Sequence, residues 1–108
     1  SEVSLIVAAR EKLEEEGIAA RIVSMPSWEL FEMQSGDYKE AVLPQSTRSR
    51  LSVEAGVSQG WHKYVGDSGD TISMERFGES APAGALMQKF GYTVENVVMR
   101  AKKLIGRD

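Results

Sequence analysis

The segment RSRLSVEA, residues 48–55, alternates apolar and polar side chains along its length. Its apolar positions are Leu51, Val53 and Ala55, two residues apart, which is the spacing of side chains that share one face of a strand. The segment therefore predicts a strand with one covered face and one partly polar face.

Two other segments predict strands, one before and one after residues 48–55. Residues 20–25 hold the adjacent pair Ile22 and Val23, and Pro26 ends the run, which suits a strand buried on both faces of a parallel sheet. Residues 71–77 give a third predicted strand.

Helical patterns alternate with these strands. The predicted helices cover residues 1–16, 26–34, 37–43, 61–64, 80–90 and 93–105. Asp37 and Glu40 form a candidate capping box, and Thr93 caps the last helix. Strands alternating with helices predict an α/β fold, with helices packed on both faces of a mostly parallel sheet. Three strands make a thin sheet, so we expect an earlier strand to be missing.

Length and composition limit the class of protein. A chain of 108 residues with 42% apolar and 27% charged residues fits one folded domain. A net charge of −3 with interspersed signs argues against a nucleic-acid partner. The absence of cysteine excludes disulfides and thiolate chemistry and is compatible with a reducing cytosol. No apolar run approaches the roughly 20 residues of a membrane span, and no targeting signal is predicted.

Two candidate catalytic groups stand out by residue type alone. His62 is the only histidine and could act as an acid or base near neutral pH, but a packing or surface role is favoured because no orienting partner is evident. Glu54 and Glu75 could pair as glycosidase carboxylates do, but nothing in their spacing selects this pairing, and charges at strand edges are the favoured explanation.

The loop before the fifth predicted helix is a candidate anion site. It leads from a predicted strand into a helix start, where backbone N–H groups point outward and favour anions. The candidate anion-binding residues are Gly78, Ser80 and Ala81. The loop lacks the glycine pattern of a dinucleotide site or a P-loop, so an ordinary capped turn is the favoured interpretation.

Aromatic residues mark a candidate contact surface. Trp28 and Phe31, with Leu30 between them, form the densest aromatic group, and Trp61 is the second tryptophan. Such a group could line a ligand pocket, but packing between domains or subunits is favoured because large rings are buried on average. We predict that Trp28, Phe31 and Trp61 serve in interdomain or dimer packing.

Several motifs, in order along the chain, carry a resemblance to a known family. They are SEVSL (1–5), RIVSMPSWELFE (21–32), SVEAG (52–56), GW (60–61), KYVG (63–66), RFG (76–78), SAP (80–82), FG (90–91) and TVENVV (93–98). Together they resemble the C-terminal domain of transketolases over essentially the whole chain. The resemblance implies one domain, residues 1–108, that is incomplete at its amino end.

The resemblance also implies a more specific fold. The family domain is a three-layer α/β/α structure around a mixed five-stranded sheet, of which two strands, one of them central, would be absent here. Residues 20–25 and 48–55 would then flank an empty slot with unpaired backbone groups. We expect the isolated chain to be unstable or to aggregate, and the upstream residues to restore cooperative unfolding.

The function implied by the resemblance belongs to a larger protein. Two preceding domains would bind thiamine diphosphate and a divalent metal, Mg or Ca, between the two subunits of a homodimer. That enzyme transfers a two-carbon ketol unit from ketose phosphates to aldose phosphates in the pentose phosphate and Calvin pathways. The residues that bind cofactor, metal and sugar phosphate belong to the earlier domains. The present chain is therefore expected to have none of them and to support the dimer, in the cytoplasm or, in a plant, the plastid stroma.

Three alternatives stay open. The chain could be a regulatory module that binds a small anionic metabolite at the Ser80 helix start. It could be the same domain of dihydroxyacetone synthase, or part of a more distant ketoacid dehydrogenase component. Residues 25–32 favour transketolase or the synthase over the last of these.

Overall fold

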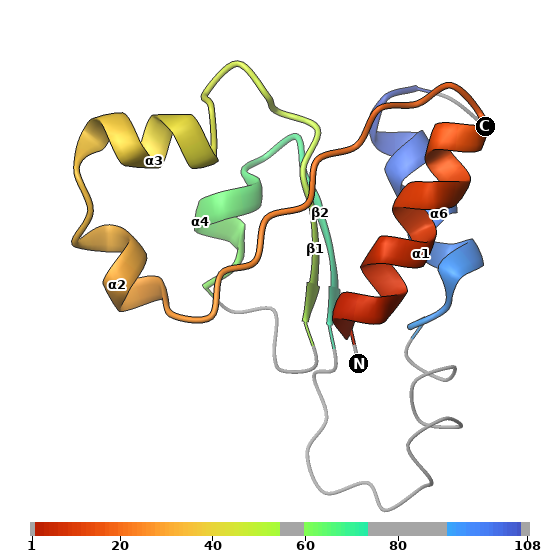
Figure 1. Ribbon diagram of the computed structural model, residues 1–108, viewed down its shortest axis with the longest axis horizontal. Coiled ribbons are helices and arrows are strands. Elements are labelled where there is room, and N and C mark those ends of the chain that lie inside the picture. The colour runs from red at the N-terminus through yellow and green to blue at the C-terminus, as the bar shows by residue number, and fades with distance from the viewer. Residues whose placement is uncertain (1, 55–59, 74–90, 107–108) are drawn as a thin grey trace, which may run out of the picture.

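Two parallel strands lie between two groups of helices (Figure 1). The computed structural model describes residues 2–54, 60–73 and 91–106. Strand β1 (Leu51–Glu54) pairs in parallel with β2 (Asp70–Ser73), and the connection between them includes helix α4 (His62–Val65). A parallel pair needs such a crossover. The predicted α/β fold with a parallel sheet is confirmed.

Helices α1 (Glu2–Glu15) and α6 (Val94–Leu104) pack against each other on one side of the strands (Figure 1). The buried core at this contact consists of Ala9, Leu13, Ile72, Tyr92, Val97 and Val98. Leu51 and Val53 pack against it, as the alternation of residues 48–55 predicts. Thr93 caps α6, as predicted, because its hydroxyl accepts the Asn96 N–H.

Helices α2 (Trp28–Glu32) and α3 (Gly36–Val42) lie on the other side, beyond α4 (Figure 1). Ser27 caps α2 by accepting the Leu30 N–H. The predicted capping box of Asp37 and Glu40 is wrong, because Ser35 already caps α3 by accepting the Tyr38 N–H. The Glu40 carboxylate instead accepts the backbone N–H of Gln45, beyond the end of the helix.

Residues 20–25 do not form the predicted strand. Ile22 and Val23 are half-buried, as the apolar pattern predicts, but within the described residues only β1 and β2 pair as strands. Burial follows from apolar side chains, whereas a strand also needs a neighbour to accept and donate its backbone hydrogen bonds. Among the described residues no strand pairs with residues 20–25, which cross the molecule outside the sheet.

The third predicted strand is confirmed over its first residues, which belong to β2. Its remainder, residues 74–77, and the predicted helix over 80–90 lie outside the described residues. Among the helices that the structure describes, none has the length and apolar character needed to cross a membrane.

Candidate functional site

Four rings form an aromatic cluster between α2 and α4: Trp28, Phe31, Trp61 and Tyr64. The Trp28 and Trp61 ring centroids are 5.2 Å apart, with the planes at 83°. Tyr64 lies at the centre, 5.9 Å from Trp28, 5.8 Å from Phe31 and 6.1 Å from Trp61. These are favourable edge-on and tilted geometries. The structure therefore brings the three predicted packing residues together around a fourth ring that the sequence did not single out.

Local sequence explains how the rings meet. Trp28 and Phe31 stand three residues apart on α2, so they share one face of that helix. Gly60 precedes Trp61 with a φ of +95°, and a Cβ atom there would lie 2.5 Å from the Trp28 ring. Only glycine allows this backbone to pass under the indole. This close approach was not predicted from the sequence, in which the glycine next to Trp61 is the only local signal for it.

A carboxylate ties the cluster together on its polar side. The Tyr64 hydroxyl donates to Glu32 at 2.9 Å, and Glu32 lies 3.2 Å from the Lys63 Nζ and 3.4 Å from the Lys39 Nζ. The hydrogen bond from Tyr64, followed by the one from Lys63, holds the pKa of Glu32 below its usual 4.5. Burial, and then the bond to Glu32, raise the pKa of Tyr64. At neutral pH a neutral phenol thus donates to an ionised carboxylate, which joins α4 to α2.

Arg50 fixes the loop after α3 to the end of α4. Its guanidinium donates to four carbonyl oxygens: Thr47 at 2.8 Å, Tyr64 at 2.6 Å, Pro44 at 2.7 Å and Leu43 at 3.2 Å. A shallow depression of about 190 Å³ lies beside it, lined by residues 45, 47–48, 50 and 65–68. Because the Arg50 donors are occupied by carbonyl groups, the arginine holds the backbone in place and leaves little donor capacity for an anion.

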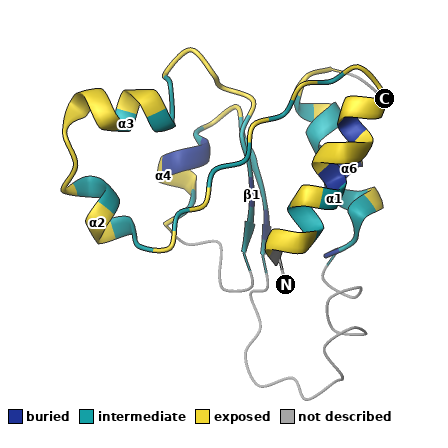
Figure 2. Ribbon diagram, in the orientation of Figure 1, coloured by how far each residue is buried: buried dark blue, intermediate teal, exposed yellow. Residues whose placement is uncertain are grey.

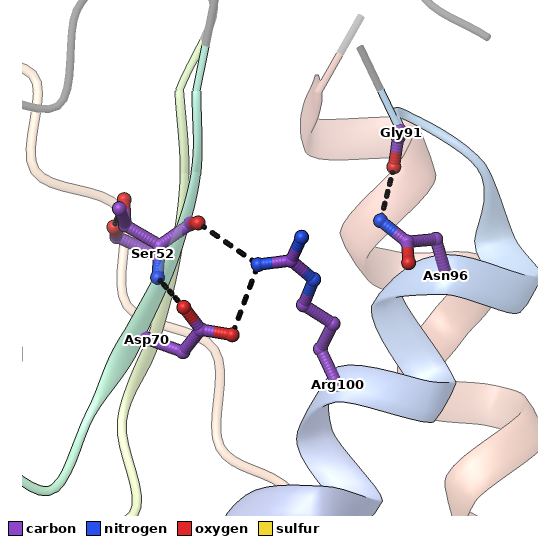
Figure 3. A network of polar contacts seen from close by, with 6 residues as sticks. Ser52, Asp70, Gly91, Asn96 and Arg100 are labelled. Carbon is purple, nitrogen blue, oxygen red and sulfur yellow. Dashed lines mark hydrogen bonds and ion pairs between the residues drawn. The ribbon is translucent and has the colours of Figure 1, made fainter. Parts of the chain in front are cut away.

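A second polar network joins α6 to β2 (Figure 3). Arg100 donates to the Asp70 carboxylate at 3.0 Å and to the Thr71 carbonyl at 3.3 Å, while Asp70 also accepts the Thr71 N–H. The Asn96 side chain donates to the Gly91 carbonyl at 2.8 Å. These charged groups are engaged in holding the helix on the sheet.

The other predicted site residues lie apart from the aromatic cluster or outside the described residues. His62 is on the surface, with its ring nitrogen 3.2 Å from the Asp67 carboxylate. Glu54 ends β1, and its backbone carbonyl accepts the Tyr92 hydroxyl. Glu75 lies outside the described residues, so its pairing with Glu54 stays a prediction.

The candidate anion residues Gly78, Ser80 and Ala81 also lie outside the described residues, and anion binding there stays a prediction. In the part of the chain that the structure describes, no group of three or more His, Asp or Glu side chains is arranged to hold a metal ion. The geometry available therefore centres on the aromatic cluster.

Comparison with known proteins identifies the family. Residues 1–93 match the family model described as the transketolase-like C-terminal domain. The chain belongs to this transketolase C-terminal domain family. A transketolase from Halalkalibacterium halodurans is 57% identical over 105 residues, which cover 97% of this chain and 16% of that protein. This member of the family therefore spans about a sixth of the length of the curated relatives it matches.

Solved structures of transketolases share the fold. The transketolase from Leishmania mexicana superposes with a TM-score of 0.85 at 49% identity, over 96% of this chain and 15% of that chain. A Pichia stipitis transketolase in complex with sedoheptulose 7-phosphate gives a TM-score of 0.82 at 39% identity, over 100% of this chain and 16% of that one. The resemblance seen in the sequence motifs is confirmed.

Proposed function

We propose that this transketolase-family chain is a non-catalytic packing domain of a complete transketolase. The observation that carries the proposal is that the chain matches a C-terminal domain over nearly its whole length, yet spans only 16% of a transketolase relative. The complete enzyme transfers a two-carbon ketol unit between sugar phosphates, the class to which the Pichia stipitis ligand belongs. Other domains hold thiamine diphosphate and a divalent metal, and two subunits form a homodimer in the cytoplasm or the plastid stroma.

The side-chain chemistry of the described residues supports a packing role. Glu32, Arg50 and Arg100 each bridge separate elements of the fold, through hydrogen bonds or ion pairs that would break if the side chain moved toward a substrate. Trp28 and Trp61 are only half-buried although their rings meet edge to face. Half-buried tryptophans of this kind are typical anchors of protein interfaces, so the aromatic cluster supports docking on the rest of the enzyme.

The test compares the full-length protein with the isolated chain and with a Trp28→Ala variant. We expect the full-length protein to transfer the ketol unit in the presence of thiamine diphosphate and a divalent metal, and the isolated chain to show no transfer. Trp28→Ala in the full-length protein should weaken assembly or lower the melting temperature. Met99→Ala, at an exposed methionine on α6, is the control and should leave both unchanged.

Two outcomes would contradict the proposal. Ketol transfer by the isolated chain would show that it contains reaction machinery. A Trp28→Ala enzyme with unchanged assembly and unchanged melting temperature would remove the docking role of the aromatic cluster.

A further inference from the structure

The outer side of α2 and α3 exposes large apolar side chains. Leu30 is 61% exposed, Met33 77% and Tyr38 50%. Leu30 and Met33 stand three residues apart and are neighbours on the helix surface, and the Tyr38 ring lies 6.4 Å from the Phe31 ring of the aromatic cluster. Figure 2 shows that α3 is mostly exposed and α2 partly exposed, and that both lie away from α1 and α6. We call Leu30, Met33 and Tyr38, with the neighbouring Glu29 and Asp37, the α2–α3 surface.

The acidic excess of the whole chain is located on these two helices. The chain has 13 Lys and Arg against 16 Asp and Glu. Residues 28–42 contain four of the acids and one of the bases, so 12 of each remain elsewhere. The one base, Lys39, is 3.4 Å from Glu32 and is engaged in the network around Tyr64. Glu29 and Asp37 are both exposed beside the apolar side chains, which makes this surface both apolar and negative.

The two helices that carry the α2–α3 surface make few contacts with the other described elements of the chain. Within the described residues, α2 and α3 have no extensive contact with the strands, α1 or α6. Helices of 5 and 7 residues are too short to be stable alone. They are fixed by the aromatic cluster, by Arg50, and by Arg21, which donates to the Ala41 carbonyl at 2.7 Å. Several specific contacts thus hold in place two helices whose outer face lacks a cover among the described residues.

We propose that the α2–α3 surface docks onto an apolar surface flanked by lysine or arginine on another domain of the same polypeptide. This inference rests on the proposed function, because it requires a larger protein around this chain. Leu30, Met33 and Tyr38 would supply the apolar contact, and Glu29 and Asp37 would face the basic groups. Charge complementarity of this kind selects the partner surface and fixes its register.

The mixed character of the surface favours a domain of the same chain over the second subunit. Interfaces between domains of one chain are more polar than obligate subunit interfaces, which resemble a divided hydrophobic core. A surface with three apolar side chains beside exposed carboxylates fits the first class. A covalently linked domain is also present at a high effective concentration, roughly millimolar for a short flexible linker, so a modest docking surface suffices.

The experiment uses the full-length protein with Glu29→Lys and Asp37→Lys together. The new lysines would face the basic groups of the partner, and like-charge contacts oppose docking. We expect amide hydrogen exchange in α2 and α3 to become at least about tenfold faster, while native mass spectrometry shows the same dimer; a tenfold change corresponds to about 1.4 kcal/mol. Glu11→Lys with Glu15→Lys on α1 makes the same charge change at exposed positions and should leave exchange in α2 and α3 unaltered.

A second variant keeps the charge and removes the apolar contact. Leu30→Asn with Met33→Gln should produce the same faster exchange, with an unchanged circular dichroism spectrum as the check on folding. Unaltered exchange in both variants would overturn the inference, and so would dissociation of the dimer, because it would assign the surface to the second subunit. A full-length protein without ketol transfer would refute the proposed function. Hydrogen exchange in α2 and α3 could still be compared between the variants and the unmodified protein, so the two failures are distinguishable.

Discussion

The two sides of the strand pair are stabilised in different ways. On the side of α1 and α6, mostly aliphatic residues from distant parts of the sequence form a buried core in which Ala9 is 1% and Leu13 4% exposed. On the side of α2, α3 and α4, rings meet edge to face and the Arg50 guanidinium donates to backbone carbonyls, while Leu30 and Met33 stay exposed. The first side has a buried core, although Val7 and Met99 on its outer surface stay 43% and 47% exposed. Among the described residues the second side has no such core and is ordered by ring contacts and hydrogen bonds, and Leu30 and Met33, at 61% and 77%, are more exposed than the apolar residues Val7 and Met99 of the first side.

The largest effect should come from the buried core. Leu13→Ala removes a buried side chain and leaves a cavity, so the free energy of local opening of α1 and α6 should fall by about 2–5 kcal/mol. Hydrogen exchange in the full-length protein measures this opening, with Val7→Ala, at a 43% exposed position, as the control of small effect. Equal acceleration in α2 and α3 would show that the two sides open as one unit and would remove the distinction between them.

A smaller effect should follow from Arg50→Lys on the other side. An ammonium group cannot reproduce the planar set of donors that reaches four carbonyl groups, and lost bonds from a charged donor cost about 1–3 kcal/mol. We expect faster exchange in α3 and α4 and no change in α6. Arg48→Lys, two residues away at an exposed position, is the matched control. If both variants behave alike, Arg50 does not hold this side together.

The smallest effect should be a shift of one pKa within the aromatic cluster. Tyr64→Phe removes the hydrogen bond that contributes most to lowering the pKa of Glu32, so this pKa should rise toward 4.5. In the native protein the lowered pKa of Glu32 stabilises the folded state above about pH 4.5. This stabilisation is lost as the pH falls through the pKa that Glu32 has in the folded protein. The variant should therefore lose less stability on acidification.

Carboxyl-carbon NMR of labelled glutamate, followed as a function of pH, measures the shift directly. Tyr38→Phe, which removes a hydroxyl from an exposed ring nearby, is the control and should leave the titration of Glu32 unchanged. An unchanged Glu32 titration in Tyr64→Phe would mean that the phenol does not tie α4 to α2 in solution.

Local signals in the sequence predicted the helices better than the strands. Ser27 and Thr93 act as caps through contacts three residues away, so nearby residues determine them. Residues 20–25 have the composition of a strand, but pairing depends on a neighbour that composition does not reveal. The capping box failed because Ser35 and Asp37 are both good caps, and the chain uses the first.

Only part of the aromatic cluster could be predicted from the sequence, and the reason is related. Trp28, Phe31 and Trp61 could be selected by size alone. Tyr64 could not, because its central position depends on the turn at Gly60 and on a bond to Glu32, which is 32 residues away in the sequence. Contacts of such separation follow from the fold and leave no local pattern.

Oxidation of two methionines in the full-length protein tests most directly whether another domain covers the α2–α3 surface. In the chain by itself Met33 is 77% exposed and Met99 47%, and methionine oxidation follows exposure. If another domain covers the α2–α3 surface, dilute peroxide should oxidise Met33 more slowly than Met99 in the full-length protein. Faster oxidation of Met33, in the order of these exposures, would contradict the account.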